Sequence, residues 1–162
     1  MRMIVSDLLD LPIQVGDELK APSDEKTLYH CMGCFGCWIK TPGRCVVKDS
    51  YMNMGKELGK CDELVLVSKC TYGGFSPFVK NVLDRFIPYI SPKYRIANNE
   101  MHHKRRYDNT IKVSVFFYSA NISTKEKDIV HDLVYALALN LFLEVSEIRF
   151  LSTITEVKEA LA

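Results

Sequence analysis

The sequence predicts an α/β fold in which a parallel, doubly wound sheet is covered by helices. Residues 62–68 contain a continuous apolar run, as expected for a strand that is buried on both faces of a sheet. Segments with a strand pattern are followed by segments with a helical pattern at least three times, and parallel strands require such crossovers. The chain has 162 residues, 48% hydrophobic and 25% charged, which suits one globular domain over residues 1–162.

The first half of the chain is predicted to contain two short strands and one helix before the central strand. Pro12, Gly16 and Pro22 interrupt any periodicity after the first strand and predict a loop. Asp49 or Ser50 is a suitable N-cap residue for the helix. The expected segments are a strand at 3–6, a loop at 10–26, a strand at 27–30, and a helix from 49 or 50 to 60 with Tyr51, Met54 and Leu58 on one face.

The second half is predicted to alternate helices with strands, and its helices carry clear start signals. These signals are Ser76 with Pro77, and two capping-box patterns, Ser123 with Glu126 and Thr153 with Glu156. The expected segments are a helix from 76 with Val79, Val82, Leu83 and Phe86 on its apolar face, a long connection at 88–109, a strand at 110–118, a helix from 123 with Ile129, Leu133, Leu137 and Leu141 on its apolar face, a strand at 145–151, and a terminal helix.

The overall charge and hydropathy exclude some classes of partner. The formal net charge of +1 favours neither nucleic acid nor a strongly acidic partner. No apolar stretch reaches the length of a membrane-spanning helix and no signal peptide is recognised, so we expect a cytoplasmic protein without membrane contact. In a reducing cytosol the six cysteines are not expected to form a disulfide framework.

Four cysteines in a C-x2-C-x2-C-x7-C pattern form the first candidate site. Gly33 and Gly36 allow the tight backbone coiling that would bring the thiols together. Four converging thiolates can hold a [4Fe-4S] cluster or zinc, or act as redox thiols. Free cysteines are also often small buried apolar residues without a ligand, and the pattern alone leaves these alternatives open. The candidate ligands are Cys31, Cys34, Cys37 and Cys45.

The loop at 70–76, after the central strand, is the second candidate site. Ligands of doubly wound sheets bind at the carboxyl ends of the strands, where the strand order reverses, and we expect both candidate loops near that edge. Gly73 and Gly74 permit close approach of a flat ligand, and Tyr72 offers a ring for stacking. Backbone N–H groups in the loop can donate hydrogen bonds to the polar atoms of a flavin. The alternative is a plain strand-to-helix turn.

Residues 31 to about 92 resemble the flavodoxin-like NAD(P)H-dependent FMN reductase family, and in particular its iron–sulfur flavoprotein branch. The matching residues are Tyr72, Ser76, Lys80, Asp84 and Arg85, and in the cysteine segment Cys31, Gly33, Cys34, Cys37, Pro42, Gly43, Cys45 and Asp49. The resemblance implies a flavodoxin-like, three-layer fold, a homodimer or higher homo-oligomer, and NAD(P)H as cosubstrate. It implies a [4Fe-4S] cluster on the four cysteines and FMN bound by Cys70, Thr71, Tyr72, Gly73, Gly74 and Ser76.

The N-terminal segment departs from that family. Relatives follow their first strand with a loop rich in Ser, Thr and Asn and with a helix whose N-terminus holds the FMN phosphate. Here Asp7 and Asp10 follow the first strand, and their carboxylates would repel a phosphate. No phosphate cradle and no first helix are predicted. We therefore expect an N-terminally abbreviated domain, or one whose site is completed by another subunit.

A basic segment at residues 100–107 is a candidate anion site in a nearly neutral chain. Arg105 and Arg106 suit forked phosphate contacts and would compensate for the missing cradle. The alternative is a solvated loop or a subunit contact. His102 and His103 are weak candidates for metal ligands.

The sequence as a whole predicts a flavin-dependent oxidoreductase that moves electrons from NAD(P)H through FMN to a small-molecule or protein acceptor. No protein general base is required, because the flavin carries the chemistry. Two alternatives belong to other functional classes. One is an electron carrier that holds an iron–sulfur cluster with or without a flavin. The other is a non-enzymatic partner or thiol-sensor domain, which the missing phosphate cradle favours.

Overall fold

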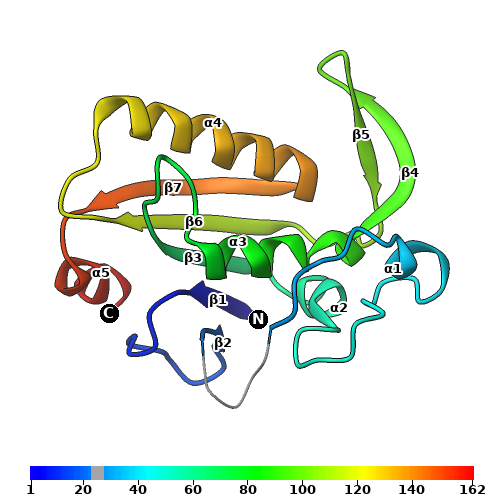
Figure 1. Ribbon diagram of the computed structural model, residues 1–162, viewed down its shortest axis with the longest axis horizontal. Helices are drawn as coiled ribbons and strands as arrows, with labels where there is room; N and C mark the ends of the chain where they lie inside the picture. Colours follow the sequence, from blue (N-terminus) through cyan, green and yellow to red (C-terminus); the bar gives the residue numbers. More distant parts are fainter. Residues whose placement is uncertain (23–27) are drawn as a thin grey trace.

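The computed structural model describes residues 1–22 and 28–162 and contains two sheets, a parallel one and an antiparallel hairpin (Figure 1). The parallel sheet has the order β2-β1-β3-β6-β7, and the hairpin consists of β4 and β5. The strands are β1 (Arg2–Ser6), β2 (Glu18–Lys20), β3 (Glu63–Lys69), β4 (Ile90–Ala97), β5 (Glu100–Arg105), β6 (Ile111–Tyr118) and β7 (Leu143–Leu151). The helices are α1 (Gly36–Ile39), α2 (Met54–Leu58), α3 (Pro77–Asp84), the 3-10 turn η1 (Ile87–Tyr89), α4 (Thr124–Leu141) and α5 (Ile154–Leu161).

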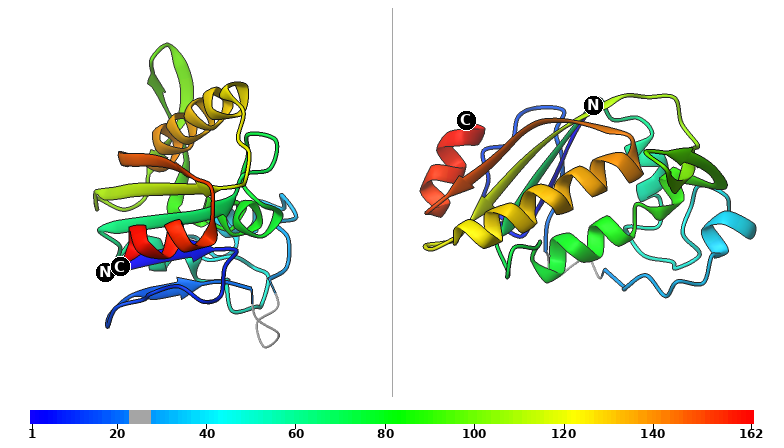
Figure 2. Two further views of the ribbon diagram at one scale, coloured as in Figure 1. Left: turned by 90° about the vertical axis from the view of Figure 1, so that its left-hand side faces the viewer. Right: turned by 90° about the horizontal axis from the view of Figure 1, so that it is seen from above.

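The two faces of the parallel sheet are covered unequally. Helices α2, α3 and α4 pack on one face against alternate residues such as Val5, Leu66 and Val115, and these side chains form the larger core. On the other face, Val157 and Leu161 of α5 join a smaller core (Figure 2, right). Among the described residues, α5 is the one helix that contributes to this second core. The predicted α/β fold, a parallel sheet flanked by helices, is therefore confirmed.

The second strand does not lie where the sequence pattern placed it. It is β2, inside the predicted loop at 10–26, and it pairs in parallel with β1 through Met3 opposite Glu18 and Val5 opposite Lys20. The strand predicted at 27–30 is wrong for residues 28–30, which are irregular, and position 27 lies outside the described residues. A strand of three residues has no measurable alternation, so only its pairing with β1 identifies it.

The long connection predicted at 88–109 is an antiparallel hairpin that projects from the body of the protein (Figure 1). Asn98 and Asn99 form its tip, with φ of 52° and 62°. Two consecutive residues with positive φ are typical of the tight turns that join two strands, and asparagine tolerates this conformation. The Asn-Asn pair was therefore a usable hairpin signal that the sequence reading missed.

The helix start signals were correct in three places and misleading in one. Ser76 accepts a hydrogen bond from the Val79 N–H at the start of α3, and Ser123 forms a complete capping box with Glu126. Thr153 accepts from the Glu156 N–H before α5. Helix α2 begins at Met54, later than predicted, because residues 50–53 form turns instead.

The buried stripe of α4 differs in part from the predicted one. Val130, Val134, Ala138 and Leu141 are its buried residues, whereas Ile129 is 42% exposed. Ile129 lies against Gly73 of the loop after β3 instead of facing the sheet. Within the described residues, none of the helices is long and apolar enough to cross a membrane.

Candidate functional site

The loop after β3 borders a cavity of about 540 Å³ at the carboxyl edge of the parallel sheet. In the strand order β2-β1-β3-β6-β7 the direction of winding reverses between β1 and β3, which is where doubly wound folds of this order bind ligands. The lining residues are Asp7, Lys69, Cys70, Thr71, Tyr72, Ser76, Pro77, Tyr118 and Glu126. We call this space the switch-point cavity. Four of the six residues predicted to bind a flavin line it, while Gly73 and Gly74 belong to the same turn without lining it.

Tyr72 lies at the tip of a tight turn on the rim of this cavity. Thr71 and Gly74 exchange two backbone hydrogen bonds of 2.9 and 3.0 Å, and the two residues between them have φ of 52° (Tyr72) and 78° (Gly73). Tyr72 is 90% exposed. A non-glycine residue in the left-handed region costs about 1–2 kcal/mol, and such strain is common at functional sites. An exposed aromatic ring held in this way is suited to stacking on a flat ligand.

The glycine at position 73 is explained by packing as well as by its φ. A Cβ atom there would lie 2.9 Å from the Cβ of Ile129 and 3.1 Å from the carbonyl oxygen of Glu126, both on α4. The base of the loop is fixed by Ser68, whose hydroxyl accepts a 2.8 Å hydrogen bond from the Ser76 N–H. The loop is therefore clamped between β3 and the first turns of α3 and α4.

Asp7 forms the wall of the cavity at the end of β1. Its carboxylate accepts hydrogen bonds from the Lys69 N–H at 2.8 Å and from the Tyr118 hydroxyl at 3.0 Å. Burial, together with the adjacent Asp7 charge, raises the pKa of Tyr118 far above its ordinary value, so the phenol stays protonated and remains a donor. Asp7 was predicted to oppose a phosphate, but its hydrogen bonds to β3 and β6 could not be inferred from the sequence.

The four cysteines line a second cavity, of about 330 Å³, together with mostly apolar residues of the same loop, Asp84 of α3 and Ile87 of η1. The lining residues are Cys31, Met32, Gly33, Cys34, Phe35, Cys37, Trp38, Cys45, Val47, Asp84 and Ile87. Burial and the nearby thiols raise the pKa of Cys37 to about 11. Within residues 1–22 and 28–162, no group of three or more Cys, His, Asp or Glu side chains is arranged as a metal site. The cysteine pattern thus gathers the thiols around one space without forming a finished coordination sphere.

The two cavities lie at opposite ends of α3, which corrects the expectation that both loops sit at the carboxyl edge. Ser76 and Pro77 at the start of α3 line the switch-point cavity, whereas Asp84 at its end lines the cysteine cavity. A helix of eight residues spans about 12 Å. The loop from 31 to 53 precedes α2 in the chain and lies at the amino edge of the sheet (Figure 1), so the prediction was wrong for the cysteine loop.

A buried ion pair attaches the cysteine loop to the end of α3. Arg85 donates to both carboxylate oxygens of Asp49, at 2.6 and 2.8 Å, and to the Tyr29 carbonyl oxygen at 2.8 Å. The two charged side chains are 0% and 2% exposed. Although burial opposes the charge of Asp49, these hydrogen bonds and those from the N–H groups of Tyr29 and Tyr51 hold its pKa below the ordinary value. Asp49 and Arg85 both belong to the motifs of the resemblance, and the structure brings them together.

The basic segment does not face the switch-point cavity. Arg106 donates from Nε to the Pro88 carbonyl oxygen at 3.0 Å, and the Arg105 guanidinium lies 4.7 Å from the centroid of the Phe142 ring. Both residues follow or end β5, at the far end of α3 from loop 70–76 (Figure 1). The hypothesis that they replace the phosphate cradle is therefore wrong for this chain.

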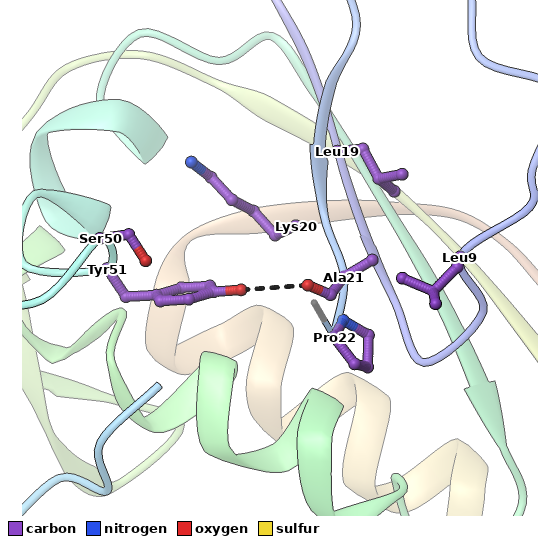
Figure 3. A pocket seen from close by; sticks show the side chains of 7 residues that line it. All are labelled: Leu9, Leu19, Lys20, Ala21, Pro22, Ser50 and Tyr51. Atoms are coloured by element: carbon purple, nitrogen blue, oxygen red, sulfur yellow. Dashed lines mark hydrogen bonds between the residues drawn. The ribbon is translucent and has the colours of Figure 1, made fainter. Parts of the chain in front are cut away.

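His102 and His103, the weak candidates for metal ligands, make contacts within the hairpin and with its neighbours. The His103 ring lies 4.6 Å from the Trp38 ring and is tilted by 45° to it, and His102 contacts Asn140 and Glu100, so both make structural contacts of the hairpin. The third cavity, of about 170 Å³, lies beside the end of β2 (Figure 3). There the Tyr51 hydroxyl donates to the Ala21 carbonyl oxygen at 3.3 Å, which ties β2 to the turn before α2 (Figure 3).

Comparisons with known proteins show the fold and leave the family open. No family model matches the chain, and no curated protein matches it in sequence. An FMN-dependent NADH-azoreductase from Bacillus anthracis str. Ames Ancestor, solved in complex with FMN, matches with a TM-score of 0.57 and 11% identity over 98% of this chain and 92% of that one. Azoreductase AzrA matches with a TM-score of 0.57 and 7% identity over 99% and 92% of the two chains. The flavodoxin-like fold class is confirmed at this level.

Proposed function

We propose that the protein is a flavin-dependent oxidoreductase that takes electrons from NAD(P)H, with the flavin ring in the switch-point cavity. The observation that carries this proposal is the strained turn that presents Tyr72 at the mouth of that cavity. The fold neighbours support the same reaction class, since one is named as an FMN-dependent NADH-azoreductase in complex with FMN and the other as an azoreductase. Their low identity leaves the electron acceptor, whether a small molecule or a protein, unnamed.

The lining of the cavity suits the ring of FMN, whereas the Asp7 carboxylate opposes its phosphate. The cavity of about 540 Å³ has room for a flavin ring between Tyr72, Pro77 and Tyr118. When bound, a flavin supplies hydride and single-electron transfer, while the protein binds and orients the ring. Among the described residues, no helix N-terminus follows β1 to hold the phosphate of FMN, because the chain passes from β1 through Asp7 to β2 without a helix. No side chain is assigned a catalytic acid–base role.

The test is flavin retention followed by NAD(P)H oxidation. Protein purified without oxygen is incubated with FMN or riboflavin, desalted, and examined by absorbance before and after NADH or NADPH is added. Replacing Tyr72 with alanine should lower retention, since stacking on an aromatic side chain contributes about 0.5–1.5 kcal/mol. Tyr135→Ala is the matched control, because Tyr135 is an exposed tyrosine on α4 that does not line the cavity. Equal retention by both variants would contradict the placement of the ring.

A second candidate, an iron–sulfur electron carrier, is favoured by the four thiols that line the cysteine cavity. Cys31, Cys34, Cys37 and Cys45 would be the ligands of a [4Fe-4S] cluster, which would add single-electron transfer to the protein. Iron and sulfide analysis of anaerobically purified protein, with a Cys34→Ser variant for comparison, tests this. Protein that retains neither flavin nor iron would support the third reading, a non-enzymatic partner or thiol sensor.

We further propose that the chain forms a homodimer. The support is the projecting hairpin, on which Ile96 and Met101 are 73% and 68% exposed and lie opposite each other on one face. Exposed apolar side chains gathered on one element are typical of interaction surfaces. Light scattering after gel filtration should give a dimer mass for the wild type and a monomer mass for Ile96→Glu.

A further inference from the structure

Asp7 occupies the position at which a protein of this strand order would hold the phosphate of its ligand. The residue directly follows β1, beside the end of β3, and its carboxylate bonds to Lys69 of β3 and to Tyr118 of β6. These two hydrogen bonds fix the carboxylate at the edge where β1, β3 and β6 end. A side chain tied to two neighbouring strands cannot swing away to admit an anion without breaking both bonds.

Three backbone N–H groups next to the Asp7 carboxylate, those of Asp7, Leu8 and Lys69, are already engaged with protein acceptors. The Leu8 N–H donates to the Ser6 hydroxyl at 2.8 Å, and the Lys69 N–H donates to Asp7 itself. The Asp7 N–H donates to the Val67 carbonyl oxygen at 3.3 Å. Anion sites at the ends of strands depend on free N–H groups that point at the ligand. The N–H groups of Asp7, Leu8 and Lys69 point at protein acceptors instead.

The charged side chains of the switch-point cavity are unfavourable for a phosphate as well. Asp7 and Glu126 are the acidic lining residues, and Lys69 is the one basic residue among those that the structure describes there. A phosphate monoester carries about −1.5 to −2 charges at neutral pH, so it is repelled by a carboxylate at close range. Hydroxyl groups, in contrast, can donate hydrogen bonds to a carboxylate, and such bonds to a charged acceptor are strong.

We propose that the switch-point cavity selects a flavin without a phosphate, namely riboflavin, over FMN, and that Asp7 is the residue that determines this specificity. The inference rests on the proposed function, because it assumes that a flavin ring occupies the cavity. The hydroxylated side chain of riboflavin would donate to Asp7, whereas the phosphate of FMN would lie against its charge. This account also explains why the described residues after β1 form no phosphate cradle, while the turn that carries Tyr72 is present.

The experiment compares the affinity of the wild-type chain for riboflavin and for FMN by fluorescence titration at low ionic strength. We expect riboflavin to bind about tenfold more tightly or better, a difference of the size that one like-charge contact produces. Added salt should narrow this ratio, because ions screen charge repulsion. Asp7→Asn should bring the two affinities together, mainly by improving FMN binding.

Asp10→Asn is the matched control. Asp10 lies in the same segment, its side chain is 93% exposed and pairs with Lys158, and it does not line the cavity. This variant should keep the wild-type ratio of affinities. FMN binding as tightly as riboflavin in the wild type would overturn the inference and leave the proposed function intact. Binding of neither flavin would overturn both, and an unchanged ratio in a folded Asp7→Asn variant would remove Asp7 as the determinant.

Discussion

Replacing Arg85 with methionine is expected to lower the free energy of unfolding by about 3–5 kcal/mol, the cost typical of removing one partner from a buried ion pair. The Asp49 carboxylate would stay buried without its counter-charge, since the two side chains are 0% and 2% exposed. The same change should loosen the cysteine loop, because Arg85 joins that loop to the end of α3.

The magnitude follows from the hydrogen bonds that are lost. The guanidinium donates to both oxygens of Asp49, at 2.6 and 2.8 Å, and each charged hydrogen bond contributes about 1.5–3 kcal/mol. The contact with the Tyr29 carbonyl oxygen is lost as well. Asp49 would keep only the N–H groups of Tyr29 at 3.2 Å and Tyr51 at 3.0 Å, which do not neutralise its charge.

The assay is urea unfolding of the variant, together with the rate at which a thiol reagent modifies the cysteines. Lys80→Met is the control on the same helix: Lys80 pairs with Asp84, but the pair is 59% and 45% exposed, so its loss should cost less than about 1 kcal/mol. Arg85→Met should also accelerate thiol modification, and Lys80→Met should not. If both variants lost the same small amount of stability, the account of Arg85 as the attachment of the cysteine loop would be wrong.

Three further predictions concern pH and backbone geometry. The folded-state pKa of Asp49 is lowered from 3.8, so this carboxylate stabilises the fold above pH 3.8 and the stabilisation is lost as the pH falls through the folded pKa. The urea midpoint of the wild type should therefore fall between about pH 5 and 2, and the midpoint of Arg85→Met should fall less. Tyr72→Gly should raise stability by about 1 kcal/mol in urea, because φ is 52°, while weakening flavin binding in the same titration. Gly55→Ala should destabilise by about 1–3 kcal/mol or more in thermal or urea unfolding, since its Cβ would lie 2.7 Å from Pro88, and an unchanged midpoint would contradict the packing of α2 on η1.

The parts of the fold that local patterns encode were predictable. The apolar run of β3 and the serine caps at Ser76 and Ser123 each depend on residues within a few positions of one another, and the structure contains all three features. Strand β2 was missed because it consists of three residues whose only signature is pairing with β1. The hairpin was missed although Asn98 and Asn99 carried a turn signal.

The place of the loop at 70–76 was predictable from the sequence, whereas the contacts around it were not. The loop at 70–76 was correctly placed at the carboxyl edge, because a strand followed by a capped helix fixes that position. The cysteine loop was placed at the wrong end of α3, because nothing local indicates on which edge a loop before α2 will pack. The bonds of Asp7 to Lys69 and Tyr118 join residues 62 and 111 positions apart, and no pattern in a single sequence encodes such contacts.

The most direct test of the central claim is whether the purified chain retains a flavin that NADH or NADPH then reduces. The account predicts stoichiometric flavin after desalting, bleaching of its absorbance when the nucleotide is added without oxygen, and lower retention in Tyr72→Ala but not in Tyr135→Ala. A wild-type protein that releases both riboflavin and FMN on desalting, and shows no change in flavin fluorescence on titration, would contradict it.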